Sequence, residues 1–425
     1  MKVLFITSGS THYFNLITSK INSTPNIDIY YLKPKVRSAT IGDGVFETDE
    51  NINFQIFELE EVVDAVTNSL SFVGLEALIN EIKPAFILAT EAHIKWLFLN
   101  EKIRAKLKND GIKIIYKTIP IWVSTYHERK IEIENKIKNA KLPEFQSLSS
   151  FLRKTLKMVG IDKIFKTLYL DVKFRESLLK QLEQDKAMYN WIDAHLNYVE
   201  EAFEVFGSYG VPREKIFITY NSPDTDFLFD IKNKIILKEG PISKNKFRIL
   251  HLSRLVEWKK VDMLIRATKN LQHKYPEIEL MVIGEGPEKN NLIALANELG
   301  VKDKVDFLGA VYDPTELGKK IMSCNIYVLA GMGGLSINDA MIYGLPVICS
   351  VCDGTEKYLV IEGYNGLYFE SGNQQSLESK IEKLLDDEVL CKNMGKNSLE
   401  IVENKINIHT VVAGYLKTFE YLSKN

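Results

Sequence analysis

The stretch "GMGGLSINDAMIYGLPVICS", residues 331–350, has three glycines within four positions, then a short helical pattern, then an apolar run. Backbone N–H groups at the start of a helix have no partner inside the helix and lie at the positive end of its dipole. The backbone of Gly334, Leu335 and Ser336 is therefore predicted to bind an anion such as a phosphate. Asp339, about one turn further along, would repel a phosphate but can accept hydrogen bonds from the two hydroxyls of a ribose.

Two basic residues follow an earlier apolar run, "RILHLS". Arg254 comes directly after this run, and Lys259 lies five residues later. A guanidinium offers phosphate a fork of donors and an ammonium acts as a point charge, so both residues are candidates for phosphate binding. The run "VDFLGAV" places Gly309, Ala310 and Val311 where exposed backbone groups could contact a nucleobase.

These residues follow apolar runs that alternate with helical patterns in two series, separated near residues 221–246. Strands are predicted at 2–7, 27–32, 54–59, 85–90, 112–117, 194–199 and 216–220, then at 248–253, 280–284, 305–310, 326–330, 346–350 and 366–370. Continuous apolar strands separated by helices are typical of parallel sheets covered on both faces. We expect an α/β protein with two doubly wound, Rossmann-like domains and ligands in the cleft between them.

Polar residues also follow two strands of the first series. Gly9 and Ser10 come after the first strand, and Glu91 and His93 come after the strand at 85–90. Because strand ends face the cleft in such sheets, these residues are candidates for substrate contacts. His93 is the candidate for acid or base catalysis, although an isolated histidine more often has a packing role.

Composition narrows the class of protein. The 425 residues allow two or three domains, and the net charge of −2 gives no reason to expect nucleic-acid binding. The N-terminal apolar run is too short for a signal peptide, and no run approaches the ~18 apolar residues of a membrane span. Cys349 and Cys352 form one C-x-x-C pair, a weak zinc signal without a second pair. A cytoplasmic protein without a metal is expected.

Residues 128–190 interrupt the alternation because they contain no convincing strand. Within them, residues 151–175 interleave lysine and arginine with phenylalanine and leucine. Two interpretations stay open: a helix that covers the sheet with a solvated charged face, or a face that binds an anionic membrane surface. The second would make the protein peripheral at the inner face of the plasma membrane.

Five blocks of the second half resemble the nucleotide-sugar-binding domain of retaining GT-B glycosyltransferases of family 4. They are "SRLVEWKK", "VIGEGP", "VDFLGA", "GMGGLSINDAMIYGLPVI" and "YNGLYF", in the order and spacing of that family. The first half fits more loosely, through "MKVLFITSGS" and residues 194–227. The resemblance implies a GT-B fold with an acceptor-binding domain at 1–225, a nucleotide-sugar-binding domain at 226–404, and a helix at 405–425 that crosses back to the first domain.

The resemblance also implies roles for individual residues. Arg254 and Lys259 match the pair that holds the diphosphate, and Asp339 matches the glutamate that binds the ribose. The implied donor is a nucleotide diphosphate sugar, with UDP favoured and GDP as the alternative, and no further cofactor is required. The implied acceptor is a hydroxyl of a cell-surface glycan such as lipopolysaccharide, carried on a lipid.

Gly331 departs from the family pattern, because it stands where the first glutamate of a Glu-x7-Glu motif would reach the transferred sugar. The leading hypothesis is a retaining hexosyltransferase with an altered choice of donor. Gly331→Glu is then expected to change that choice without weakening the bare nucleotide. Two alternatives stay open: a non-catalytic, nucleotide-sugar-binding partner subunit, and a GT-B epimerase, which would need acidic groups around the sugar.

Overall fold

The computed structural model describes residues 1–38, 47–50, 52–118, 123–139, 162–351 and 354–425. The side chains of residues 12–13, 136–139 and 162–175 lie outside that description.

The first lobe is built on a parallel sheet with the strand order β3-β2-β1-β6-β7-β8-β9. Its strands are β1 (Lys2–Ile6), β2 (Asp28–Pro34), β3 (Gln55–Leu59), β6 (Phe86–Thr90), β7 (Lys113–Thr118), β8 (Ala194–Asn197) and β9 (Ile216–Ile218). Its helices include α1 (His12–Asn22), α2 (Leu75–Ile82), α3 (Glu91–Leu99), α4 (Glu101–Asn109) and α8 (Ala202–Ser208), with the 3-10 turn η2 (Arg213–Lys215).

The second lobe repeats this plan with the order β12-β11-β10-β13-β14-β15, again all parallel. Its strands are β10 (Arg248–Leu252), β11 (Glu279–Ile283), β12 (Val305–Gly309), β13 (Ile326–Leu329), β14 (Val347–Cys349) and β15 (Gly366–Tyr368). Its helices are α10 (Val261–Leu271), α11 (Lys289–Glu298), α12 (Pro314–Met322), α13 (Ser336–Ile342), α14 (Glu356–Leu359), α15 (Gln374–Asp386) and α16 (Glu388–Asn404), with the turns η3 (Glu257–Lys259) and η4 (Lys302–Lys304).

The expected α/β class with two doubly wound parallel sheets is therefore confirmed, and each strand predicted from the sequence is present within a residue or two of its predicted ends. An antiparallel hairpin of β4 (Glu61–Val63) and β5 (Leu70–Phe72) was not predicted. Each of its strands is three residues long and carries a polar residue, so neither forms a continuous apolar run.

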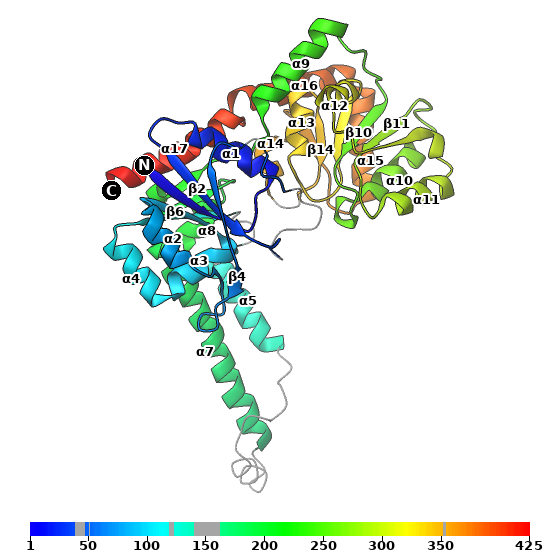
Figure 1. Ribbon diagram of the computed structural model, residues 1–425. Coiled ribbons are helices and arrows are strands. Elements are labelled where there is room, and N and C mark those ends of the chain that lie inside the picture. Colours follow the sequence, from blue (N-terminus) through cyan, green and yellow to red (C-terminus); the bar gives the residue numbers. More distant parts are fainter. Residues whose placement is uncertain (39–46, 51, 119–122, 140–161, 352–353) are drawn as a thin grey trace.

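A helix begins at each of the two points where the chain passes between the lobes (Figure 1). Helix α9 (Thr225–Glu239) begins directly after the first crossing, and Asp224 caps it by accepting a hydrogen bond from the Phe227 N–H at 3.3 Å. Helix α17 (Ile408–Lys424) returns to the first lobe, where Val411, Tyr415 and Phe419 share a hydrophobic core with β1. The end of the chain therefore stabilises the domain that contains its beginning.

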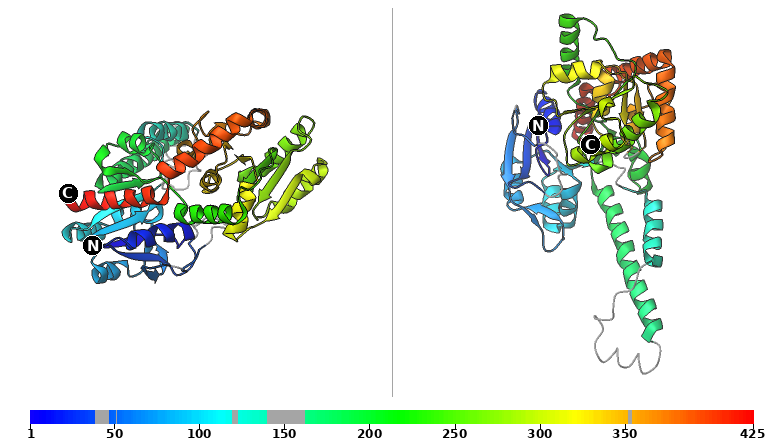
Figure 2. Two further views of the ribbon diagram at one scale, coloured as in Figure 1. Left: turned by 90° about the horizontal axis from the view of Figure 1, so that it is seen from above. Right: turned by 90° about the vertical axis from the view of Figure 1, so that its right-hand side faces the viewer.

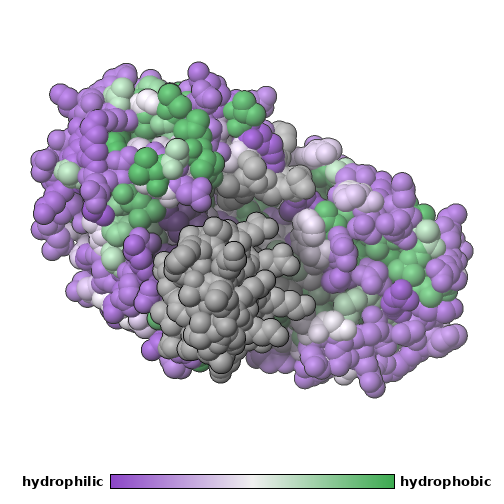
Figure 3. Space-filling view, turned by 90° about the horizontal axis from the view of Figure 1, so that it is seen from below, coloured by the Kyte–Doolittle hydropathy of each residue, from purple (hydrophilic) through white to green (hydrophobic). Residues whose placement is uncertain are grey.

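The helices α5 (Tyr126–Asn139) and α7 (Asp162–Trp191) form a long pair that projects from the first lobe (Figure 1, Figure 2). The basic segment 151–175 lies outside the described side chains, so the choice between a solvated face and a membrane-binding face stays open. The surface seen from below is largely hydrophilic, with apolar residues in patches on both lobes (Figure 3). Among the helices described, none has the length and apolar composition needed to cross a bilayer.

Candidate functional site

The strand order of the second sheet reverses between β10 and β13, which lie side by side at its centre. In a doubly wound sheet, the loops after two such strands diverge and leave a crevice between them. Here these loops are residues 253–260 and 330–335. They contain Arg254, Lys259 and the glycine-rich stretch, so the fold brings together the main candidates from the sequence.

Lys259 ties the two loops together. Its side chain is buried, and its ammonium donates hydrogen bonds to the backbone carbonyls of Met332 and Gly333, each at 2.7 Å. In the opposite direction, the Met332 N–H donates to the carbonyl of Trp258 at 3.1 Å. A positive charge thus lies against the glycine-rich loop. Lys259 also holds the two loops together, which the sequence did not predict.

Gly331 lies directly against the backbone of the loop 253–260. A Cβ atom at this position would lie 1.9 Å from the Trp258 carbonyl oxygen and 2.8 Å from the backbone of Lys259. Since such contacts are sterically forbidden, the loops accommodate only glycine here. The expectation that Gly331→Glu would leave nucleotide binding unchanged is therefore wrong on steric grounds, because the substitution displaces the loop itself.

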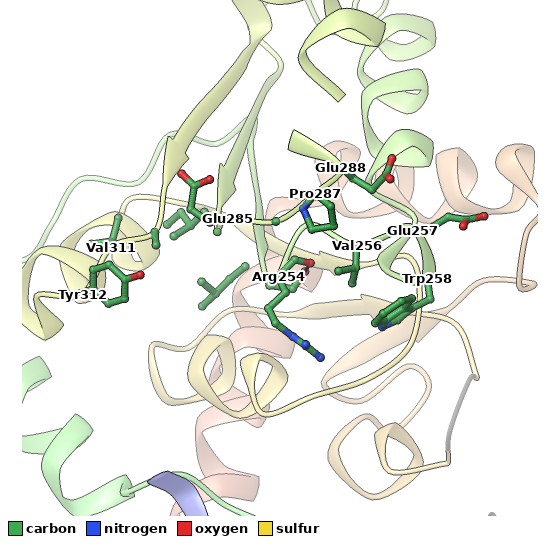
Figure 4. Close-up of a pocket in the computed structure, with 15 residues that line it drawn as sticks. Arg254, Val256, Glu257, Trp258, Glu285, Pro287, Glu288, Val311 and Tyr312 are labelled. Carbon is green, nitrogen blue, oxygen red and sulfur yellow. Dashed lines mark hydrogen bonds between the residues drawn. The ribbon is translucent and has the colours of Figure 1, made fainter. Parts of the chain in front are cut away.

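A cavity of about 700 Å³ opens beside Arg254. Figure 4 shows the Arg254 side chain in the middle of the site, with Trp258 to one side and Val311 and Tyr312 to the other. Both aromatic residues are exposed, Trp258 by 44% and Tyr312 by 89%. The cavity thus offers a cation flanked by flat apolar surfaces, which suits a ligand with an anionic part and a planar part.

Arg254, Ala310 and Val311 were predicted from the sequence and line this cavity, whereas Gly309 lies just behind it at the end of β12. The sequence did not single out several further lining residues: Glu257, Trp258, Glu285, Glu288 and Tyr312. Their position next to predicted strand ends is the feature of the sequence that could have identified these residues.

Backbone hydrogen bonds hold the cavity wall together. Leu255 N–H donates to the Glu285 carbonyl at 2.9 Å, and Gly284 N–H donates to the Gly309 carbonyl at 2.8 Å. Gly284 has a φ of +144°, and a Cβ there would lie 1.8 Å from the Ser253 carbonyl oxygen. Glycine at this position therefore permits the close approach of the loops after β10 and β11.

Gly334 and Leu335 line a second, smaller cavity of about 160 Å³. This cavity is also lined by Tyr198 of the first lobe and by Tyr220 at the first crossing. A Cβ on Gly334 would lie 3.5 Å from the Lys259 ammonium, so this loop segment borders the same positive charge. Arg254, Ala310 and Val311 thus line one cavity, and Gly334 and Leu335 line the other. Neither of these two cavities is lined by the predicted residues Lys259, Gly331, Ser336 and Asp339.

Ser336 and Asp339 lie on α13, which begins at the end of that loop. The Ser336 hydroxyl is hydrogen-bonded to the Tyr327 hydroxyl at 2.8 Å, so its side chain faces the sheet. Burial raises the pKa of Asp339 to about 7 from its ordinary 3.8. A carboxylate in such surroundings is costly to ionise, and it gains from hydroxyl donors supplied by a ligand.

Gly9 and Ser10 follow β1, at the point where the first sheet also reverses its order. The Gly9 carbonyl accepts from the Tyr31 hydroxyl at 2.7 Å, and the Ser10 hydroxyl donates to the Thr48 carbonyl at 2.9 Å and to the Asp49 carboxylate. These bonds order the loop, and the Ser10 side chain is buried.

Glu91 and His93 follow β6 but have different surroundings. Glu91 is exposed to solvent and accepts a hydrogen bond from the Thr118 hydroxyl at 3.4 Å. His93 is buried, hydrogen-bonded to Glu61 at 2.8 Å and stacked on Phe72 at 4.8 Å. These contacts pack His93 against the β4–β5 hairpin, so the geometry gives no support to its predicted catalytic role.

Metal-ligating side chains are not gathered at this site. Within the described part of the chain, no group of three or more His, Cys, Asp or Glu residues has a suitable arrangement. Asp226, in the Asp-x-Asp pattern at the first crossing, pairs instead with Lys20 at 3.2 Å and with His409 at 2.8 Å.

Comparison with known proteins places this site in context. Residues 232–401 match the family model of glycosyl transferases group 1. An uncharacterized glycosyltransferase of Methanocaldococcus jannaschii is 30% identical over 189 residues, covering 42% of this chain and 46% of that protein. The N-acetyl-alpha-D-glucosaminyl L-malate synthase of Bacillus anthracis is 27% identical over 206 residues, with coverage of 48% and 53%.

The capsular polysaccharide biosynthesis glycosyltransferase CapM of Staphylococcus aureus is 28% identical over 187 residues, with coverage of 41% and 46%. The chain thus matches about half the length of these curated relatives. Among solved structures, HepE of Anabaena in complex with UDP has a TM-score of 0.60 at 15% identity, covering 99% of this chain and 100% of that one. This likeness concerns the fold.

Proposed function

We propose that the protein transfers a sugar from a nucleotide diphosphate sugar to a hydroxyl of a glycan, a proposal supported by the match of residues 232–401 to the glycosyl transferases group 1 model and by the likeness of the fold to that of HepE. The observation that carries the proposal is the crevice after β10 and β13, where Arg254 and Lys259 lie beside the glycine-rich loop. Two cations and exposed backbone groups at that edge suit a diphosphate.

Each part of a donor then has a counterpart in the site. Arg254 binds the diphosphate, and the charge that develops on it as the sugar leaves is stabilised by Arg254 and by the Lys259 ammonium. The base occupies the 700 Å³ cavity near Ala310 and Val311. The Asp339 carboxylate, on α13, accepts hydrogen bonds from the ribose hydroxyls. UDP is the favoured nucleotide, supported by the UDP found in the structurally similar HepE, with GDP as the alternative.

The sugar configuration and the acceptor are finer parts of the same proposal. Transfer proceeds with retention, as the resemblance to family 4 implies, and the acceptor binds over the first domain near Gly9, Ser10 and Glu91. A polysaccharide precursor carried on a lipid fits the capsular-polysaccharide relative and the basic segment 151–175. That segment would hold the protein at an anionic membrane surface.

The experiment is a panel of UDP- and GDP-sugars offered with glycan acceptors, with release of nucleoside diphosphate and product formation both measured. One donor should support transfer, and proton NMR of the product should show the anomeric configuration of the donor. Tight UDP binding without turnover of any donor would favour the non-catalytic partner subunit instead. Conversion of one UDP-sugar into its epimer without an acceptor would favour the epimerase.

A further inference from the structure

A carboxylate of the first domain contacts the second domain directly. Glu201 precedes the first residue of α8, which packs beside β9 of the first sheet. Its carboxylate accepts a hydrogen bond from the Tyr358 hydroxyl and pairs with the Lys357 ammonium at 3.4 Å. Both partners belong to α14, which follows β14 of the second sheet.

Glu200, the residue before Glu201, makes a similar contact where the chain crosses between the domains. Glu200 accepts from the Tyr220 hydroxyl at 2.7 Å, and the Tyr220 ring lies 6.0 Å from the Tyr358 ring. The Lys405 ammonium, at the second crossing, lies 5.6 Å from the centre of the same Tyr220 ring. The start of α8, both crossings and α14 therefore meet at one junction.

This junction borders the glycine-rich loop. Tyr358 and Thr355 line the 160 Å³ cavity together with Gly334 and Leu335. On the same side, the Asn338 amide donates to the Asn221 carbonyl at the first crossing, at 3.4 Å. Helix α14 therefore lines the same cavity as the loop that is proposed to hold the diphosphate, and it packs against α13, which begins at the end of that loop.

We propose that Glu201 is a positioning residue for sugar transfer. Through Tyr358 and Lys357 it holds α14, and with α14 the glycine-rich loop, in a fixed position relative to the first domain. The inference rests on the proposed function, in which the donor binds one domain and the acceptor the other. Such a reaction depends on the relative placement of the two domains, and a shift of about 1 Å can lower a rate by about a hundredfold. Nucleotide binding, in contrast, uses groups of the second domain alone.

The test compares Glu201→Ala with the parent in the full-length protein. The variant should bind UDP within twofold of the parent by titration calorimetry, whereas kcat for transfer should fall at least tenfold with little change in the donor KM. Tyr358→Phe should also lower kcat, and the double variant should lose less than the product of the two single effects. Glu204→Gln, an exposed residue on the same helix, is the matched control and should behave like the parent.

Two outcomes would overturn the proposal: a Glu201→Ala kcat within twofold of the parent, or a loss of UDP affinity that accounts for the whole loss of rate. If the parent transfers no sugar at all, the proposed function fails and the positioning role is tested separately by amide hydrogen exchange. Glu201→Ala should then raise exchange at residues 354–360 without raising it in β10–β13. Unchanged exchange there would refute the positioning role.

Discussion

Replacement of Asp339 by asparagine should stabilise the unliganded protein while weakening nucleotide binding. Burial raises the pKa of this carboxyl from 3.8 to about 7, a shift of about three units. At about 1.4 kcal/mol per unit, ionisation of Asp339 at pH 8 costs at most about 4 kcal/mol of folding free energy. Asparagine has nearly the same shape and no charge, so this cost disappears.

The pH dependence has a definite sign. Between about pH 4 and pH 7 the folded protein holds the Asp339 proton while the unfolded chain has released it. Stability from this group is therefore greatest at the acidic end of the window and falls as pH rises toward 7. The stability of the Asn variant does not fall in this way. The amount by which its free energy of unfolding in urea exceeds that of the parent should therefore be larger at pH 8 than at pH 5.

Binding should change in the opposite direction. Ribose hydroxyls donate to the ionised carboxylate, and a hydrogen bond to a charged group contributes roughly 1.5–3 kcal/mol. UDP affinity of the parent should rise between pH 6 and pH 8, and Asp339→Asn should lower affinity at pH 8 by about ten- to a hundredfold in titration calorimetry.

Asp306→Asn is the control, because Asp306 is an exposed carboxylate on β12. It should change neither stability nor affinity appreciably. An Asp339→Asn variant that binds UDP as tightly as the parent at pH 8 would show that the carboxylate does not contact the ribose. A variant less stable than the parent at pH 8 would show that the carboxylate is compensated in the folded protein.

Four further expectations concern the same crevice and the membrane. Arg254→Ala should weaken UDP binding by roughly 1.5–3 kcal/mol with unchanged unfolding, and equal affinity would remove its assignment to the diphosphate. Gly331→Ala should lower both UDP affinity and thermal stability, since even a methyl group collides with the carbonyl of Trp258; normal values for both would contradict the loop packing. Lys260 has a φ of +52°, so Lys260→Gly should raise the free energy of unfolding by up to about 1 kcal/mol, and a loss instead would mean that its side chain stabilises the turn. Anionic vesicles should recruit the protein at low salt through 151–175, and charge reversal of several of its lysines should abolish recruitment; equal binding to neutral vesicles would leave the solvated-face interpretation.

Much of the fold was predictable because the two sheets are buried on both faces. Their strands are continuous apolar runs, and alternation with helices specifies parallel pairing. The β4–β5 hairpin was missed because Glu61–Val63 and Leu70–Phe72 are short and partly polar. His93 was assigned to the cleft by its place after β6, but its partner Glu61 comes from that unpredicted hairpin.

The identities of Arg254, Lys259 and the glycines after β13 were enough to predict an anion site, because strand ends and helix starts impose local chemistry that depends on residue type and spacing. Only the tertiary structure decided what these groups contact. Lys259 reaches carbonyls 73 and 74 positions away, and Glu201 reaches Tyr358 across 157 positions. The physical reason is that such partnerships depend on which strands become neighbours and on how the two domains are joined, and no local pattern of residues specifies either.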